Sequence, residues 1–277
     1  MSSLGKTLAT ELEAIRAAQL YRARRVVESF SDAESAVHVI VDGESRINFC
    51  GNDYLGLSRH PDVRSAFIAA AGEFGVGSGA SHLVTGHSRE HHALEEELAA
   101  FVRRPRALLF STGYMANLAA IAALARRGDL VAEDRLNHAS LIDAACVSGA
   151  TLKRYTHGSV ATLERLLVEE AKGRAIVATD GVFSMDGDVA PLKELAALCR
   201  ARDAWLVVDD AHGLGVTGPT GRGSLEDAQL GLDEVPVVVG TLGKAFGTFG
   251  AFIAGTDELI EFLIQKARSY IYTTALP

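Results

Sequence analysis

Residues 235–247 read VPVVVGTLGKAFG, a short apolar run followed by a turn in which Lys244 stands among glycines. An apolar run that ends in turn residues is typical of a buried β-strand. Gly240, Gly243 and Gly247 would let the backbone approach a ligand closely. A lysine in such a turn is either a solvated surface cation or a nucleophile, and a nucleophilic lysine needs an enclosed site that favours its neutral form.

The same strand-then-helix pattern repeats from residue 106 onward. The runs that read as strands are RALLF (106–110), DLVAED (129–134), TLKRY (151–155), RAIVATDG (174–181) and AWLVVDD (204–210). Strands that alternate with helices of about 10–15 residues predict an α/β fold, with a mostly parallel sheet that helices cover on both faces. In such folds, ligands bind at the carboxyl ends of the strands.

The first 50 residues follow a different pattern. Apolar residues at helical spacing predict a helix over residues 4–28, and VHVIVDGESRINFC (37–50) predicts a hairpin with Asp-Gly at its turn. We therefore expect an N-terminal helix and hairpin segment over residues 1–50, followed by a large α/β domain over residues 51–277.

Composition disfavours several classes of protein. The 277 residues carry a net charge of -8 and no long basic run, so nucleic acid is not an expected partner. The three cysteines form no CxxC pair, which argues against structural zinc, and no metal is expected. The N-terminus does not read as a signal or transit peptide, and no apolar run approaches the roughly 18 residues of a membrane span. A soluble cytoplasmic protein without a membrane partner is expected.

Polar residues follow several of the predicted strands. STGYM (111–115) either caps the next helix in the ordinary way or offers backbone N–H groups to a phosphate. Asp209 and Asp210 follow a buried strand, where a carboxylate needs a cationic or hydrogen-bonding partner unless it caps the next turn. Asp180 and Ser184 stand after the preceding strand.

Two nucleotide-binding motifs are matched only in part. GLGVTG (213–218) has the spacing GxGxxG, but it neither follows its strand directly nor opens a helix, so a dinucleotide site is disfavoured. Lys244 is not in a P-loop, because Val238 and Ala245 stand where that motif has glycine and Ser or Thr. A nicotinamide-dependent oxidoreductase and a non-catalytic binding module remain as alternatives from other classes.

The polar strand ends together suit pyridoxal phosphate. This cofactor needs a lysine to bond its aldehyde, a carboxylate to keep its pyridine nitrogen protonated, and a pocket for its phosphate. A glycine-flanked lysine, an acid after a buried strand and a phosphate cradle meet these three needs.

The chain resembles the α-oxoamine synthase family, within the fold-type I pyridoxal-phosphate enzymes, over essentially its whole length. The stretches that carry the resemblance are NDYLGL (52–57), GSGASHLVTGHSREHHALEEELA (77–99), DRLNHASLIDAA (134–145), DGVFSMDGDVAPL (180–192), VDDAHGLGVTGPTGRGS (208–224) and GTLGKAFGTFGA (240–251). As a set they are specific to this family.

The resemblance implies roles for individual residues. Lys244 would bond the cofactor and then transfer protons, Asp209 would pair with the pyridinium nitrogen, and His138 would stack on the ring and meet the substrate. Arg22 would bind substrate, unless it lies on a solvated helix face. The remaining cofactor contacts would be Gly113, Tyr114, Ser184, His212 and Thr241.

The last group has distinct positions on the cofactor. Ser184 and His212 would face the phenolic oxygen, and Thr241 would bind the phosphate. The family often has phenylalanine where Tyr114 stands, which matters little if the backbone makes the contact.

The implied reaction is the decarboxylative condensation of L-alanine with a pimeloyl thioester, carried by CoA or by an acyl carrier protein. A homodimer is expected from the resemblance. Glycine C-acetyltransferase, which takes glycine and acetyl-CoA, is the alternative within the family, because one methyl group is worth only about 1–3 kcal/mol of discrimination.

The chain ends at Pro277, soon after a predicted helix. The resemblance implies a further C-terminal domain of roughly a hundred residues, with an arginine for the amino-acid carboxylate. The expectation is that the 277 residues keep most cofactor groups but turn over poorly. Thr273 and Thr274 stand where the family sends a threonine to the partner's phosphate.

Overall fold

The computed structural model describes residues 2–30 and 37–277, and the chain divides into two compact units, Met1–Gly51 and Asn52–Pro277. In the first unit, helix α1 (Ser3–Ala17) precedes an antiparallel sheet of β1 (Val27–Phe30), β2 (His38–Val41) and β3 (Glu44–Ile47). Asp42 and Gly43 join β2 to β3 with positive φ of 55° and 75°, as a two-residue hairpin turn requires. The predicted hairpin is confirmed.

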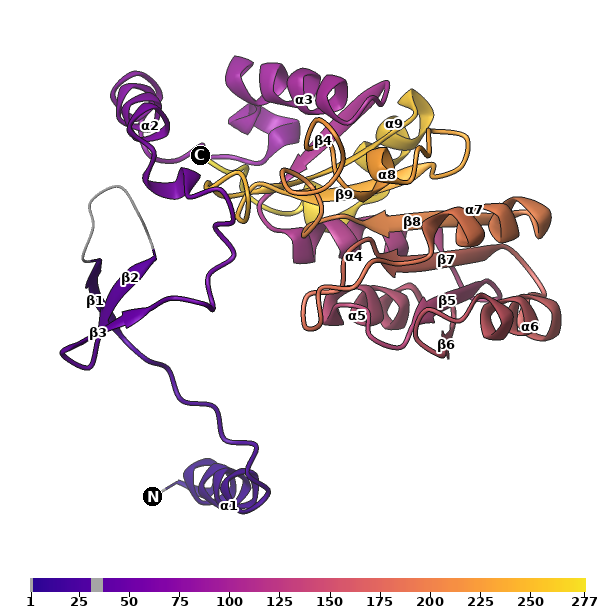
Figure 1. Ribbon diagram of the computed structural model, residues 1–277, viewed down its shortest axis with the longest axis horizontal. Helices are drawn as coiled ribbons and strands as arrows, with labels where there is room; N and C mark the ends of the chain where they lie inside the picture. Colours follow the sequence, from indigo (N-terminus) through magenta and orange to yellow (C-terminus); the bar gives the residue numbers. More distant parts are fainter. Residues whose placement is uncertain (1, 31–36) are drawn as a thin grey trace. The chain divides into compact units, whose positions relative to one another are not determined.

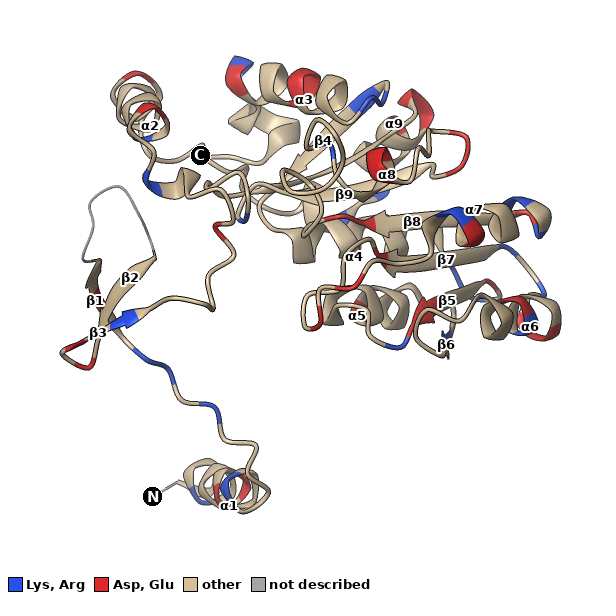
Figure 2. Cartoon of the chain, in the orientation of Figure 1, with Lys and Arg blue, Asp and Glu red and all other residues tan. Residues whose placement is uncertain are grey.

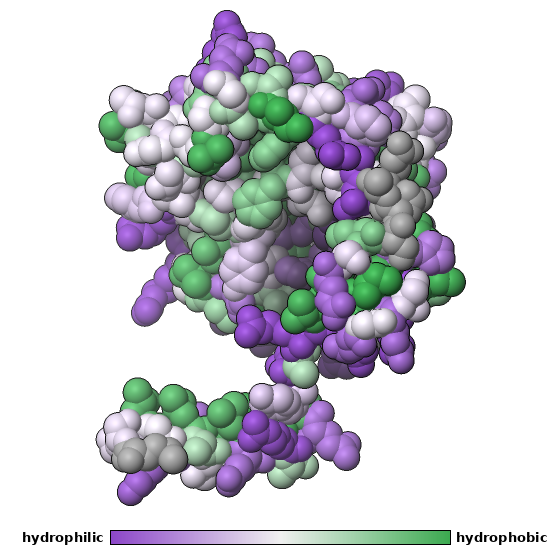
Figure 3. Space-filling view, turned by 90° about the vertical axis from the view of Figure 1, so that its left-hand side faces the viewer, coloured by the Kyte–Doolittle hydropathy of each residue, from purple (hydrophilic) through white to green (hydrophobic). Residues whose placement is uncertain are grey.

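Helix α1 is shorter than the spacing predicted. It ends at Ala17, and Gln19 has a φ of 58°, in the left-handed region that ends helices. Figure 3 shows hydrophobic side chains along one side of this helix, at the bottom of the view. The four apolar residues of α1 that gave the helical spacing are exposed. They are Leu4, Leu8, Leu12 and Ile15.

The second unit contains a seven-stranded sheet in the order β4-β10-β9-β8-β7-β5-β6. The β5–β6, β5–β7, β7–β8 and β8–β9 pairs are parallel, and β10 runs antiparallel to both β4 and β9. The mostly parallel sheet is therefore confirmed. The strands are β4 (Arg106–Phe110), β5 (Leu130–Asp134), β6 (Thr151–Tyr155), β7 (Ala175–Asp180), β8 (Ala204–Asp209), β9 (Val237–Thr241) and β10 (Ala251–Gly255).

The second unit also contains helices, and the long ones other than α2 pack against this sheet (Figure 1). Those longer than five residues are α2 (Pro61–Phe74), α3 (Arg89–Phe101), α4 (Gly113–Leu124), α5 (Ala139–Ser148), α6 (Val160–Glu170), α7 (Leu192–Ala201) and α9 (Asp257–Lys266). The short ones are the 3-10 helix η1 (Leu57–Arg59), the π-helix η2 (His82–Gly86), α8 (Ser224–Asp227) and α10 (Arg268–Ile271).

Apart from the edge strand β6, the strands are buried on both faces, and alternate residues of a strand enter different cores. Leu108 and Phe110 of β4 pack in the core formed with α4, α5, α9 and α10. Ala107 and Leu109 of the same strand pack on the opposite face with α3. Helices α6, α7 and α8 cover the rest of that second face. This layering explains why the strands read as continuous apolar runs.

The strand directions bring several polar strand ends to one edge. Asp180 at the end of β7 pairs in register with Asp209 at the end of β8. Thr241 at the end of β9 and Phe110 at the end of β4 both pair with Ala251 of β10, so these two strands end at the same edge on either side of β10. This carboxyl edge is where a ligand site is expected.

Residues 213–218 lie in turns and open no helix. Gly215 and Gly218 both have a φ of 82°, and Leu214 forms a bridge with Arg222. A dinucleotide fingerprint needs its glycines at the start of a helix, so the nicotinamide alternative has no support here.

Charge is distributed over the helices and loops. Figure 2 shows Lys and Arg interspersed with Asp and Glu along the elements of both units. Among the described residues, no helix has both the length and the apolar character needed to cross a membrane.

Candidate active site

Lys244 lies in the turn that follows β9. The turn needs glycine at 247, where φ is 65° and a Cβ would come within 2.2 Å of the Ser58 backbone nitrogen. The half-buried amine is 2.7 Å from Nε2 of His212. Burial lowers the pKa of Lys244, although the nearby Asp209 and Asp180 oppose that shift. The amine is thereby closer to the neutral form that a nucleophile needs.

His212 is held between Lys244 and Tyr54. Its Nδ1 lies 2.7 Å from the Tyr54 hydroxyl, which itself donates to Asn52 Oδ1 at 3.2 Å. Burial, and then the charge of Lys244, lowers the pKa of His212 to about 4, so the ring is neutral near pH 7. Since a lysine amine donates when charged, Nε2 accepts and Nδ1–H donates to Tyr54.

Asp209 has a hydrogen-bond donor on each oxygen. Asn117 of α4 donates to Oδ2 at 2.6 Å, and the backbone N–H of Ala211 donates to Oδ1 at 3.0 Å. Both oxygens of this carboxylate, which is 7% exposed, therefore have a hydrogen-bond donor. The requirement that an acid on a buried strand be paired is met here by neutral donors.

Asp180 is a neighbouring acid in a different state. Burial, with a further contribution from Asp209, raises the pKa of Asp180 to about 8. It is therefore mostly protonated at neutral pH, and the backbone N–H of His138 donates to its Oδ2 at 3.1 Å. Two acids side by side thus avoid placing two full charges in a buried place.

His138 is oriented at the N-cap of α5 by Ser140. The Ser140 hydroxyl accepts from Asn117 Nδ2 at 2.8 Å and lies 2.7 Å from His138 Nδ1. Because the Ser140 backbone N–H also points at Nδ1 from 3.3 Å, Nδ1 is an acceptor and the ring proton is on Nε2. A continuous network therefore joins His138 to Asp209 through Ser140 and Asn117.

The N-terminus of α4 and the end of β9 complete the site. Thr112 caps α4 by accepting from the Met115 N–H at 3.2 Å, so Gly113 and Tyr114 occupy the first turn, whose N–H groups have no intrahelical acceptor. Thr241 accepts from the Gly243 N–H at 3.2 Å and donates to the Gly250 carbonyl at 3.1 Å.

These groups line one cavity of about 160 Å³ at the carboxyl edge of the sheet. Its lining residues are Gly113, Tyr114, Asn117, His138, Ser140, Asp180, Asp209, Ala211, His212, Thr241 and Lys244.

Comparison with known proteins agrees with this arrangement. The model of the family described as aminotransferase class I and II matches residues 44–277. The 8-amino-7-oxononanoate synthase of Methylococcus capsulatus is 62% identical over 269 residues, which is 97% of this chain and 68% of the relative. That of Thioalkalivibrio sulfidiphilus is 59% identical over 98% of this chain and 69% of the relative.

The chain belongs to the 8-amino-7-oxononanoate synthases, within the aminotransferase class I and II family. The predicted membership is confirmed, and so is the fold-type I class. Serine palmitoyltransferase from Sphingomonas wittichii superposes with a TM-score of 0.90 at 34% identity, covering 100% of this chain and 69% of that one. The 8-amino-7-oxononanoate synthase structure from Francisella tularensis has a TM-score of 0.72 at 38% identity, covering 83% and 64%.

Pyridoxal phosphate is the cofactor of this group, and the predicted cofactor is confirmed. One similar serine palmitoyltransferase structure contains it as an internal aldimine. The cavity has the groups this cofactor needs, namely the Lys244 amine, the Asp209 carboxylate and the first turn of α4. Asn117 Oδ1, on the same wall, is buried with no hydrogen-bond partner among the described residues, as expected where a polar ligand fits.

Two predicted site residues are not among the residues that line this cavity. Ser184 is exposed in the loop that follows β7. The buried Phe183 and the bridge between Val182 and Val189 fix the base of this loop. Arg22 is exposed in the first unit. The roles of both residues stay predictions.

Sequence reasoning missed four residues of the site: Tyr54, Asn117, Ser140 and Asp180, the last noted only as a polar strand end. Asn117 had a readable signal, since it is a buried amide in the apolar helix GYMANLAAIAAL, and such a group must find a hydrogen-bond partner. Tyr54 had no local signal, because its partner His212 is 158 positions away.

Proposed function

We propose that this chain catalyses the pyridoxal-phosphate-dependent, decarboxylative condensation of L-alanine with a pimeloyl thioester. The products are 8-amino-7-oxononanoate, CO2 and the free thiol carrier, and the step belongs to biotin biosynthesis. The observation that carries the proposal is that the Lys244 amine and the Asp209 carboxylate line one cavity, in a chain 62% identical to a synthase of that name.

Different residues of the chain would bind different parts of the cofactor. Lys244 would bond its aldehyde carbon, and Asp209, fixed by Asn117 and Ala211, would pair with its ring nitrogen. The N–H groups of the first turn of α4, together with Thr241, would hold its phosphate. When bound, the cofactor supplies an electron-withdrawing ring that stabilises negative charge at the α-carbon of the amino acid.

Lys244 is the group placed to move the α-proton. Its lowered pKa favours the neutral amine, which is the form that a general base needs. His212 accepts a hydrogen bond from this amine and, being neutral, does not add a second charge beside it. His212 therefore orients the base, and Tyr54 orients His212.

His138 would meet the substrates from the other side of the cavity. With Nδ1 occupied by Ser140, its Nε2–H is the available donor for an oxygen of the amino acid or the thioester. The ring orientation is set before any ligand arrives, which limits the reorganisation needed at reaction.

Product formation tests this proposal. The protein, supplied with pyridoxal phosphate, is mixed with L-alanine and pimeloyl-CoA, and the product is identified by mass spectrometry. We expect 8-amino-7-oxononanoate and equal amounts of free CoA. Turnover of glycine with acetyl-CoA, and none of the first pair, would replace this proposal with the glycine C-acetyltransferase alternative.

Three finer expectations depend on the same proposal. The sequence resemblance predicts a homodimer, an acyl carrier protein as a possible source of the pimeloyl group, and a cytoplasmic location. Light scattering of the purified protein would measure the first, and the assay repeated with pimeloyl carrier protein would measure the second.

A further inference from the structure

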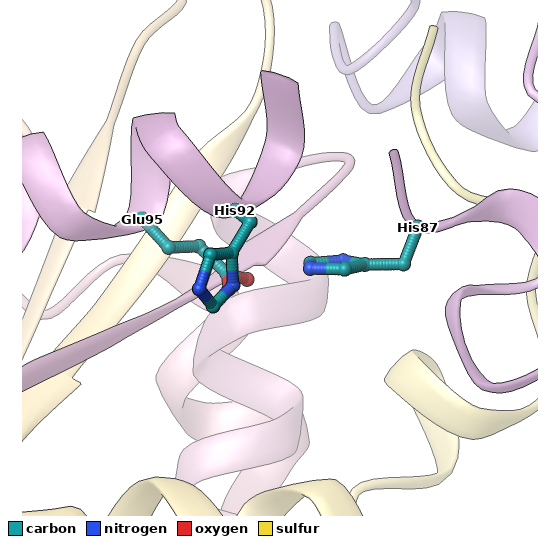
Figure 4. Close-up of side chains that lie close together, drawn as sticks. All are labelled: His87, His92 and Glu95. Carbon is teal, nitrogen blue, oxygen red and sulfur yellow. The ribbon is translucent and has the colours of Figure 1, made fainter. Parts of the chain in front are cut away.

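Three side chains around the start of α3 form a cluster outside the cavity described above. His87 precedes the helix, and His92 and Glu95 stand three positions apart on it, with one potential ligand atom from each lying within 4.8 Å of the others. In Figure 4 the far edge of the His87 ring points at His92 and Glu95. Two imidazoles and a carboxylate are ligands that zinc and similar divalent metals accept.

The cluster residues are held by neighbours through the atoms that a metal would not use. Nδ1 of His87 lies 3.0 Å from Nδ1 of His82, so Nε2 of His87 is the nitrogen left for an ion. Glu95 Oε1 accepts from the Leu109 backbone N–H at 2.9 Å, so Oε2 is the oxygen left. Outer partners of this kind orient metal ligands in known sites.

The anchor of His87 is itself fixed. The His82 ring stacks on Tyr270 of α10, with ring centres 4.9 Å apart and planes 14° from parallel. His82 is 7% exposed, so its ring has little freedom.

The cluster opens into a cavity of about 530 Å³, large enough for an ion and its water. Two arginines also line this cavity, but both have partners. Arg104 donates to the carbonyls of Gly231 and Val235, each at 3.2 Å, and Arg106 pairs with Glu261 at 3.3 Å. The hydrogen-bonding groups of both arginines are therefore engaged elsewhere, although the charge of Arg106 still reaches Glu95 and would weaken cation binding.

We propose that His87, His92 and Glu95 bind one divalent transition-metal ion, with zinc as the best match, and that water takes the fourth position. Tetrahedral bonds of about 2.0–2.1 Å place ligand atoms roughly 3.3 Å apart, so the side chains must close by about 1.5 Å. Rotation of the exposed His92 side chain supplies this movement.

Two nearby residues are not ligands in this assignment. Both ring nitrogens of His91 are in use, Nδ1 with the Ser88 N–H and Nε2 with the Leu276 carbonyl. Glu96 is an exposed neighbour 3.6 Å from His92 Nε2. It therefore competes for His92 and serves as the matched control for Glu95.

The bound ion would join the segment 82–87 to α3. Because it would bind the folded chain and not the disordered one, it would raise the unfolding temperature with increasing metal concentration. This property is independent of the proposed condensation and can be measured without substrate.

Calorimetric titration of tag-free protein, saturated with pyridoxal phosphate, with Zn²⁺ tests the proposal. We expect one equivalent bound per chain, affinity lowered at least about tenfold in His92→Gln and Glu95→Gln, and affinity kept within about threefold in Glu96→Gln. In Glu95→Gln the amide oxygen can still accept the hydrogen bond from the Leu109 backbone N–H, so we expect the fold to be preserved. Thermal unfolding without zinc checks this for every variant.

A second readout is the visible spectrum of added Co²⁺, taken as the difference between the wild-type protein and His92→Gln so that cofactor absorption cancels. Intense visible bands of four-coordinate cobalt, lost in His92→Gln, support the assignment. The proposal would be overturned if Zn²⁺ gave no heat of binding or if all variants bound it equally. It would also be overturned if Glu96→Gln lost zinc binding while Glu95→Gln kept it.

Discussion

Two histidines of the larger unit have opposite pKa shifts, although both lie at the same edge of the sheet. Burial, then the neighbouring Lys244, lowers the pKa of His212 to about 4. His157 is more open, and its hydrogen bonds to Asp134 (2.9 Å) and Asp188 (2.8 Å) outweigh burial and raise its pKa. One ring accepts a hydrogen bond from Lys244 in its neutral form, and the other lies between two acids that favour its protonated form.

This difference shows how the cavity and the loop beside it are held. The cavity depends on neutral groups and fixed donors, which keep Lys244 and Asp209 in place without adding charge. The loop that carries Ser184 is attached through the 2.8 Å contact between His157 Nε2 and Asp188, next to the edge-on contact of His157 with Phe183. Lower pH should therefore disturb the cavity and favour the loop attachment.

The largest expected effect comes from Lys244→Ala. This change removes both the amine that bonds the cofactor and the base, so we expect product formation to fall at least about a thousandfold. Mass-spectrometric product assays measure it, with Lys153→Ala as a control, since that lysine pairs with Glu170 away from the cavity. More than a tenth of wild-type activity in Lys244→Ala would contradict the account.

The two adjacent acids should respond differently to the same substitution. Asp209→Asn removes the charge that Asn117 and Ala211 stabilise, and we expect a rate loss of about a hundredfold. Asp180→Asn should cost less than about threefold at pH 7, because Asp180, with a pKa of about 8, is already mostly protonated. Steady-state rates of both variants at pH 7 check this, and equal losses would refute the different protonation states.

His212→Phe tests the neutral partner of the base. The folded-state pKa of about 4 lies below the ordinary 6.5, so the unfolded chain binds more protons between these values. Stability should therefore fall as pH is lowered through this window. In His212→Phe we expect the unfolding temperature to decrease less as pH is lowered, by roughly 2–4 °C, as measured by scanning calorimetry. An unchanged pH dependence would count against the assigned state.

The smallest expected effect is that of His157→Gln. A raised folded-state pKa means that the stabilisation is present below about pH 6.5 and is lost as pH rises through the folded-state value. His157 and its partner Asp188 are partly exposed, so the unfolding temperature of the wild-type protein should exceed that of the variant by less than about 3 °C at pH 6, and by less again at pH 9. Calorimetry at the two pH values measures it; an advantage that grows with pH would be the opposite of this prediction.

The parts of the structure that sequence could predict are those set by local pattern. Continuous apolar runs identified β7, β8 and β9, because a strand buried on both faces has no polar side to show. The polar residues directly after these runs, Asp209 and Lys244, then followed from the shared edge of a parallel sheet. The Asp-Gly turn likewise fixed the hairpin of the first unit.

The parts that sequence could not predict depend on distant contacts. The end of α1 at Ala17 was missed because apolar residues continue at helical spacing as far as Leu20. The left-handed conformation of Gln19, which ends the helix, has no signal in that spacing. The raised pKa of Asp180 depends on burial and on the neighbouring Asp209, and neither is visible in the stretch itself. The histidines at 87 and 92 were read as part of a family motif, so their proximity to each other and to Glu95 went unused.

The attachment of the cofactor to Lys244 tests the central claim most directly. The protein is incubated with pyridoxal phosphate, reduced with borohydride to make any carbon–nitrogen bond permanent, digested and mapped by mass spectrometry. The account predicts the added mass on the peptide that contains Lys244, and none there after Lys244→Ala. Modification confined to another lysine, such as Lys153 or Lys266, or none in the wild-type protein, would contradict it.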